Sequence, residues 1–134
     1  MQSYHHKTKK QFEVNALAPL KITHALLPNL KSGSKIIVIT SRMGSLADNT
    51  SGSRYGYRMS KAALNIAAIS LAHDLKPKNI AVGIFHPGQV STDMTGYNGI
   101  PVSQSVNQLL QRFEALNINN SGQFYHANGE ILPW

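Results

Sequence analysis

Apolar residues recur at helical spacing in three stretches of the chain. Residues 9–30, 55–76 and 103–117 carry apolar side chains mostly three or four positions apart. A Lys-Ser-Gly-Ser segment follows the first stretch and Pro77 follows the second, and both are helix stop signals. The pattern predicts three amphipathic helices.

Short apolar runs lie between and after these stretches. Residues 36–41 and 80–85 are almost continuously apolar, which is typical of strands covered on both faces in a parallel sheet. A third, short strand is predicted near residues 123–125, before a turn at Asn128-Gly129. Strand, helix and strand in this order predict a right-handed βαβ unit. We therefore expect an α/β fold with three strands and three main helices.

Pro19 lies inside the first predicted helix, four residues after Asn15. Proline has no N–H group, so the carbonyl of Asn15 loses its helical partner and the helix should kink there. Such a carbonyl can bind a water molecule in a proton relay. A kink that serves packing alone is the other interpretation of the same pattern.

Composition narrows the class of protein. The chain has 134 residues, of which 42% are hydrophobic, and this predicts one globular domain over residues 1–134. The absence of cysteine excludes disulfides and thiolate zinc sites, and no histidine pair has zinc-ligand spacing on a helix. The apolar runs are far shorter than the roughly 20 residues of a membrane span, and the first ten residues lack the apolar segment of a secretory signal. We expect a cytoplasmic protein with no metal site.

The net charge of +7 reflects 13 Lys and Arg against only six Asp and Glu. The basic residues are scattered after a cluster near the N-terminus, and no nucleic-acid-binding motif is present. A solvated basic surface is therefore expected, with no nucleic-acid partner. Weak attraction to the phosphates of a dinucleotide is compatible with it.

Four polar residues should meet at one edge of the sheet. Ligands of open parallel sheets bind outside the carboxyl ends of the strands. Ser41 ends the first predicted strand, Thr92 follows the second, and Tyr57 and Lys61 lie near the start of the intervening helix.

Tyr57 and Lys61 are four residues apart, so they share a face of the helix. A cation beside a phenol favours the phenolate, which makes Tyr57 a candidate general acid or base. Ser41 could hydrogen-bond a substrate oxygen as charge develops on it. The alternative for Tyr-x-x-x-Lys alone is an exposed helical pair, because short motifs also occur by chance. A hydrolase based on Ser41 and His86 would need a Gly-x-Ser-x-Gly elbow, which is missing.

The combination of segments resembles the short-chain dehydrogenase/reductase family, in its carbonyl-reductase-like (C-factor-like) branch. The resemblance covers about residue 10 to Trp134. It is carried by Phe-Glu-Val-Asn at 12–15, Ile-Val-Ile-Thr-Ser-Arg-Met-Gly-Ser at 37–45, Tyr-Arg-Met-Ser-Lys-Ala-Ala-Leu-Asn at 57–65 and His-Pro-Gly-Gln-Val-Ser-Thr-Asp-Met at 86–94.

The resemblance implies a role for each matched residue. Tyr57 would be the catalytic acid/base, Lys61 would tune it and hold the nicotinamide ribose, and Ser41 would position the substrate carbonyl. Asn15 would complete the tetrad through a water relay. The cofactor would be NAD or NADP, and the substrate a small carbonyl or alcohol. The residues expected at the cofactor are Tyr57, Lys61, Pro87, Gly88, Val90 and Thr92.

The glycine-rich turn that opens the family's cofactor site has no match in this sequence. By resemblance the chain corresponds to the C-terminal, catalytic part of a Rossmann-type doubly wound parallel sheet. We therefore expect a truncated domain whose first strand is an exposed edge, and which binds NAD(H) or NADP(H) weakly and is inactive alone.

Two functions follow from these expectations. The first is an NAD(P)-dependent oxidoreductase that transfers hydride between the nicotinamide and a carbonyl/alcohol pair. The second is a non-catalytic fragment that acts as an interaction or dimerisation module. Small residues in the 55–76 helix permit close helix packing, and in the resembled family this helix and the 9–30 helix form the dimer interface. A homo-oligomer through these two helices is expected.

Overall fold

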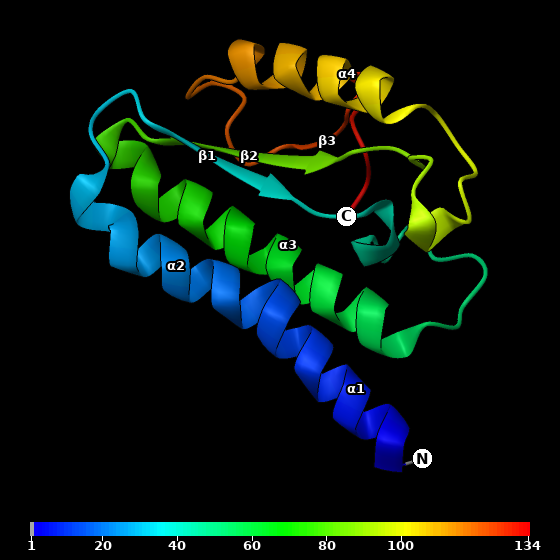
Figure 1. Cartoon of the computed structure of the whole chain (residues 1–134). Helices are drawn as coiled ribbons and strands as arrows, with labels where there is room; N and C mark the ends of the chain where they lie inside the picture. Colours follow the sequence, from blue (N-terminus) through cyan, green and yellow to red (C-terminus); the bar gives the residue numbers. More distant parts are fainter. Residues whose placement is uncertain (1) are drawn as a thin grey trace.

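The computed structural model describes residues 2–134, which form a three-stranded parallel sheet with helices on both faces (Figure 1). The sheet has the order β1-β2-β3, as expected for an α/β fold. In chain order, the helices and strands are α1 (Gln2–Phe12), α2 (Ala18–Leu26), β1 (Lys35–Ile39), α3 (Tyr55–Leu75), β2 (Ala81–His86), α4 (Val102–Ala115) and β3 (Phe124–His126).

The helices form layers about the sheet. Helix α4 covers one face, whereas α3 covers the other and separates the sheet from α1 and α2 (Figure 1). Alternation along β2 explains this arrangement, because Val82 and Ile84 belong to the core cluster that includes Ala68 of α3, while the Phe85 ring lies 5.5 Å from that of Phe113 of α4. The buried strand β2 therefore holds the two layers together.

The first helix differs from the prediction at its start and contains the predicted irregularity. It begins at Gln2 rather than near residue 9, so the basic N-terminal segment is helical. Between α1 and α2, residues Glu13–Leu17 are π-helical, and the Ala18 N–H donates to the Glu13 carbonyl. The interruption is centred on Asn15 and precedes Pro19, as the missing proline N–H predicts.

Strand β1 corrects two expectations. It ends at Ile39: the Thr40 N–H still donates to the Phe85 carbonyl of β2, but Ser41 caps the turn Arg42–Gly44. Its residues are half-buried or exposed instead of covered on both faces. The reason is its place in the sheet: among residues 2–134, β1 pairs with β2 alone, so its other edge is free.

The pairing register brings the strand ends together. Ile39 of β1 pairs with Phe85 of β2, and His86 of β2 pairs with His126 of β3. The carboxyl ends of all three strands thus lie at one edge of the sheet, next to the start of α3 (Figure 1).

Within the described residues, no helix is long and apolar enough to cross a membrane.

Candidate active site

Tyr57 and Lys61 lie one turn apart near the start of α3, and both are half-buried. The Lys61 Nζ is 5.8 Å from the centroid of the Tyr57 ring. Burial lowers the pKa of Lys61 from its ordinary value. Both ion pairs found among residues 2–134 belong to Arg42, so Lys61 has no carboxylate partner there. The ammonium group therefore faces the phenol without a competing anion.

Ser41 is held in a tight turn against the same helix. Its side chain is buried, and its Oγ accepts a hydrogen bond from the Met43 N–H at 3.1 Å. A Cβ atom on Gly44 would lie 2.8 Å from the backbone carbon of Lys61. Only glycine permits this approach, which brings the Ser41 turn onto the helical turn that carries Lys61.

Thr40 and Asn65 attach the end of β1 to α3. The Thr40 Oγ1 donates to the Asn65 Oδ1 at 2.6 Å, and both residues are buried. The Asn65 Nδ2 is buried without a hydrogen-bond partner among the described residues and would lie 2.8 Å from a Cβ on Gly44. The Thr40–Asn65 hydrogen bond thus fixes the position of the neighbouring Ser41 along the axis of α3. The sequence pattern alone did not reveal this contact.

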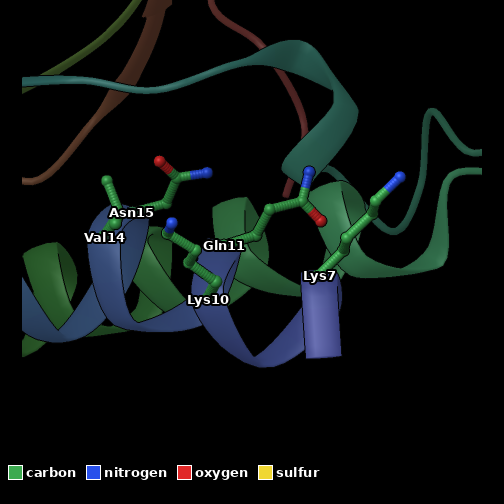
Figure 2. Close-up of a pocket in the computed structure, with 5 residues that line it drawn as sticks. All are labelled: Lys7, Lys10, Gln11, Val14 and Asn15. Carbon is green, nitrogen blue, oxygen red and sulfur yellow. The ribbon is translucent and has the colours of Figure 1, made fainter. Parts of the chain in front are cut away.

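Asn15 also reaches α3. Its Nδ2 donates to the Ser60 Oγ at 3.0 Å, and Ser60 in turn donates to the Tyr57 carbonyl at 2.8 Å. Its side chain lines a hollow of about 340 Å³ along α1, together with Lys7, Lys10, Gln11 and Val14 (Figure 2). Ser60 therefore connects Asn15 to the backbone carbonyl of Tyr57, on the helix that also carries Lys61.

The residues after β2 form a separate loop at the same edge of the sheet. Gly88 is buried with a φ of +88°, a conformation that favours glycine. The Thr95 Oγ1 donates to the Val90 carbonyl at 2.6 Å and accepts from the Thr92 N–H at 3.1 Å. Ser105 of α4 donates to the Pro87 carbonyl at 2.7 Å. These bonds fix the backbone of the loop that contains Pro87, Gly88, Val90 and Thr92.

Two further residues, Arg42 and His86, join these loops. The Arg42 N–H donates to the His86 Nδ1 at 3.1 Å. Burial, His126 and Arg42 together lower the pKa of His86 to about 4, so at neutral pH its ring is uncharged and can accept this bond. Neither residue was among the site residues expected from the sequence. The sequence signal that could have identified them is that both lie at the carboxyl ends of neighbouring strands, where ligands of parallel sheets bind.

Comparison with known proteins shows what the chain is similar to. The family model described as short chain dehydrogenase matches residues 2–100. The chain is 45% identical over 128 residues to the C-signal protein of Myxococcus xanthus, covering 93% of this chain and 77% of that protein. It is 40% identical over 131 residues to 1-hydroxy-2-glutathionyl-2-methyl-3-butene dehydrogenase of Rhodococcus sp. (strain AD45), covering 94% of this chain and 58% of the dehydrogenase.

A solved structure gives the same result. The NADPH-bound carbonyl reductase from chicken fatty liver superposes with a TM-score of 0.87 at 31% sequence identity. The match covers 95% of this chain and 57% of the reductase, so the chain spans little more than half the length of that protein and of the Rhodococcus dehydrogenase. Family model, relatives and structure agree, and this chain belongs to the short chain dehydrogenase family.

Proposed function

We propose that this chain carries the catalytic residues of an oxidoreductase that transfers hydride between NAD or NADP and a carbonyl/alcohol pair. One observation carries the proposal: the half-buried Lys61 ammonium stands 5.8 Å from the Tyr57 ring, with the Ser41 turn packed against the same helix. We propose that the Tyr57 phenol, the Lys61 cation and the Ser41 hydroxyl, which these contacts bring to the same helix, are the acid, the charge and the hydrogen-bond donor used in carbonyl reduction.

Ser41 is set to act as a hydrogen-bond donor. Its Oγ accepts from the Met43 N–H, so its own proton remains available for a substrate oxygen. As a carbonyl is reduced, negative charge grows on that oxygen, and a donor fixed beforehand stabilises the charge without reorganisation.

Tyr57 is proposed to give its proton to the nascent alkoxide, and to take it back when an alcohol is oxidised. The Lys61 ammonium favours the phenolate left behind, because opposite charges attract strongly at a half-buried site. Asn15 is proposed to support proton return through a water molecule at the π-helical segment, beside the Ser60 bridge to the Tyr57 carbonyl.

The described residues fit the nicotinamide end of the cofactor. Gly88 is buried at a positive φ, which favours glycine, and a Cβ there would lie 3.4 Å from the His126 ring. We propose that the backbone of this loop lies against the nicotinamide. Lys61, which has no acidic partner, could hold ribose hydroxyls. A bound nicotinamide supplies or accepts the hydride. We propose weak binding of the free cofactor, because the sequence contains no glycine-rich phosphate turn.

The chain alone is expected to be inactive because it binds the cofactor weakly, so the test supplies millimolar NADPH or NADH to offset the weak binding. Reduction of a small aromatic aldehyde is then measured by the loss of reduced-nicotinamide absorbance. Tyr57→Phe should lower kcat/KM by about 100-fold or more, because it removes the transferable proton. Tyr55→Phe is the matched control, since Tyr55 lies two positions earlier and is exposed. Equal loss in both variants, or turnover unchanged in Tyr57→Phe, would contradict the assignment.

A second function has its own supporting observation. The free edge of β1 and the exposed apolar side chains of α2, such as Ile22 and Leu26, are surfaces that another polypeptide could cover. A non-catalytic interaction or dimerisation module would self-associate or bind a partner and show no turnover. Titration calorimetry carried to millimolar NADPH, as the proposed weak binding demands, distinguishes the two, since only the oxidoreductase requires nicotinamide binding.

A further inference from the structure

Two histidines lie side by side where β2 and β3 end. His86 and His126 are the last residues of these strands and pair in register. Their rings are 5.2 Å apart and nearly perpendicular. Neither residue takes part in the hydride-transfer chemistry proposed above.

His86 connects the loop after β2 to the turn after β1. Its Nδ1 accepts the Arg42 N–H, and Arg42 directly follows Ser41. In the same turn the Ser41 Oγ accepts the Met43 N–H. These two bonds satisfy consecutive N–H groups of the turn, so the orientation of the Ser41 hydroxyl depends on both.

The Arg42 side chain ties the same turn to the C-terminal segment. Its Nε is 3.1 Å from the Asp48 Oδ2, and its Nη2 is 3.5 Å from the Glu130 Oε1. His126 also belongs to the segment, because its Nδ1 accepts the Asn128 N–H at 3.0 Å. Its ring stands against Gly88, as the close approach of a Cβ there indicates.

We propose that His86 is a positioning residue, whose hydrogen bond from the Arg42 N–H holds Ser41 in register with the Pro87-Gly88 loop. The His126 ring of β3, which packs against Gly88, supports the position of the Pro87-Gly88 loop. The effect on catalysis rests on the function proposed above, whereas the hydrogen bond itself is a property of the fold. The charged and titratable groups around His86 are Arg42 and His126, and Asp48 and Glu130 beyond Arg42.

The bond can be observed directly in the full 134-residue chain. An N–H···N hydrogen bond gives a through-bond ¹⁵N–¹⁵N coupling, so we expect a cross-peak between the Arg42 amide and the His86 Nδ1. At neutral pH the His86 ring should be neutral and protonated on Nε2, because Nδ1 accepts. Absence of the cross-peak in the folded chain would overturn the proposal.

A matched pair of variants tests what the bond does. His86→Asn retains an acceptor at the position of Nδ1, whereas His86→Leu places a methyl group there. Hydrogen exchange of the Arg42 amide should rise by about 10-fold in His86→Leu and stay near that of the unsubstituted chain in His86→Asn, as expected for one lost hydrogen bond. His24→Leu, on the exposed surface of α2, is the control. Equal exchange in the Leu and Asn variants would refute the role of the acceptor.

Kinetics then separate positioning from binding. His86→Leu should lower kcat by about 10-fold with little change in KM for the aldehyde, and His86→Asn should restore it, because a misplaced Ser41 donor acts mainly in the transition state. If His86→Leu does not fold, the cross-peak and the kinetics of His86→Asn decide. If the chain shows the cross-peak but no turnover, the hydrogen bond between Arg42 and His86 is confirmed and the proposed oxidoreductase function is contradicted. Turnover unaffected in a folded His86→Leu refutes positioning.

Discussion

At Gly56 the distance between two helices is set by a missing side chain. A Cβ there would lie 2.7 Å from the Thr8 Oγ1 and 3.2 Å from the Thr8 Cα, so α1 rests directly on the backbone of α3. Gly56 directly precedes Tyr57, and the contact therefore fixes the backbone of Tyr57 relative to α1. The motif Tyr-x-x-x-Lys predicted the pair, but the supporting glycine could not be identified, because nothing in one sequence indicates which helix crosses it.

Gly56→Ala should destabilise the fold by about 1–2 kcal/mol, because overpacking outweighs the higher helix propensity of alanine. In the background of Thr8→Ala and Gln11→Ala, which removes the Oγ1 and Oε1 atoms, the same change should cost clearly less, because only the tight approach to the Thr8 Cα remains. Urea unfolding of the four proteins measures the coupling. A stabilising effect of Gly56→Ala alone would show that α1 does not rest on this position.

His86 makes stability depend on pH. Its pKa is lowered to about 4 from 6.5, so the unfolded chain takes up a proton at a higher pH than the folded one. Stability is then complete above pH 6.5 and falls as the pH drops towards 4, by about 2 kcal/mol once the exposed part of the ring is allowed for.

Unfolding free energies at neutral pH and near pH 4 measure this contribution. His86→Asn should reduce the decrease, whereas the carboxylates paired with Arg42 contribute equally in both proteins. His24→Asn, at an exposed position, should leave the decrease unchanged. An identical decrease in His86→Asn and the unsubstituted chain would mean that the ring titrates as in water.

At the scale of elements, α3 is the structural centre, because it packs against the sheet on one side and against α1 on the other (Figure 1). Its alanines explain how it fits, since Ala68 and Ala72 are buried in the core. Periodicity placed α3 and β2 to within one residue of their bounds, because both are covered on several sides and apolar residues recur along their whole length. It placed the start of the first helix late, because residues 2–8 are polar and their helicity depends on the contact with α3.

Ala68→Leu should lower the free energy of unfolding by about 1–3 kcal/mol, because the added carbons have no room between α3 and the sheet. It should also lower kcat, since α3 carries Tyr57. Ser70→Leu, on the exposed side of the same helix, should change stability by no more than about 0.5 kcal/mol. Denaturant unfolding gives both values, and equal losses would contradict the layer order.

At the scale of the whole molecule, several large apolar side chains remain on the surface. Ile22 of α2 is 59% exposed and Ile66 of α3 is 62% exposed. The sequence predicted the helices on which they lie but not their exposure, which depends on what covers the outer faces. The same applies to β1: its free edge was expected, but its apolar side chains, expected to be covered on both faces, are half-buried or exposed.

A homo-oligomer through α1–α2 and α3 would cover these side chains. Ile22→Lys and Ile66→Lys should each shift the chain towards monomer, because a buried isoleucine contributes roughly 1.5–3 kcal/mol. Leu46→Lys is the control, since Leu46 is exposed in a loop outside both helices. Sedimentation over a range of concentrations measures the effect. A monomer at all concentrations, or equal shifts in all three variants, would contradict this interface.

The π-helical segment at Glu13–Leu17 sets the rotation of α1 about its axis relative to α2. One residue of an α-helix corresponds to about 100° of rotation, so the wider turn changes which side chains of α1 face α3 relative to those of α2. Only one rotation of α1 relative to α2 lets Thr8 pack on Gly56 while Asn15 donates to Ser60. Deletion of one residue within 13–17 would turn α1 about its axis and remove Thr8 from Gly56. We therefore expect a change in the length of this helix to disturb the site more than a single substitution on its exposed side.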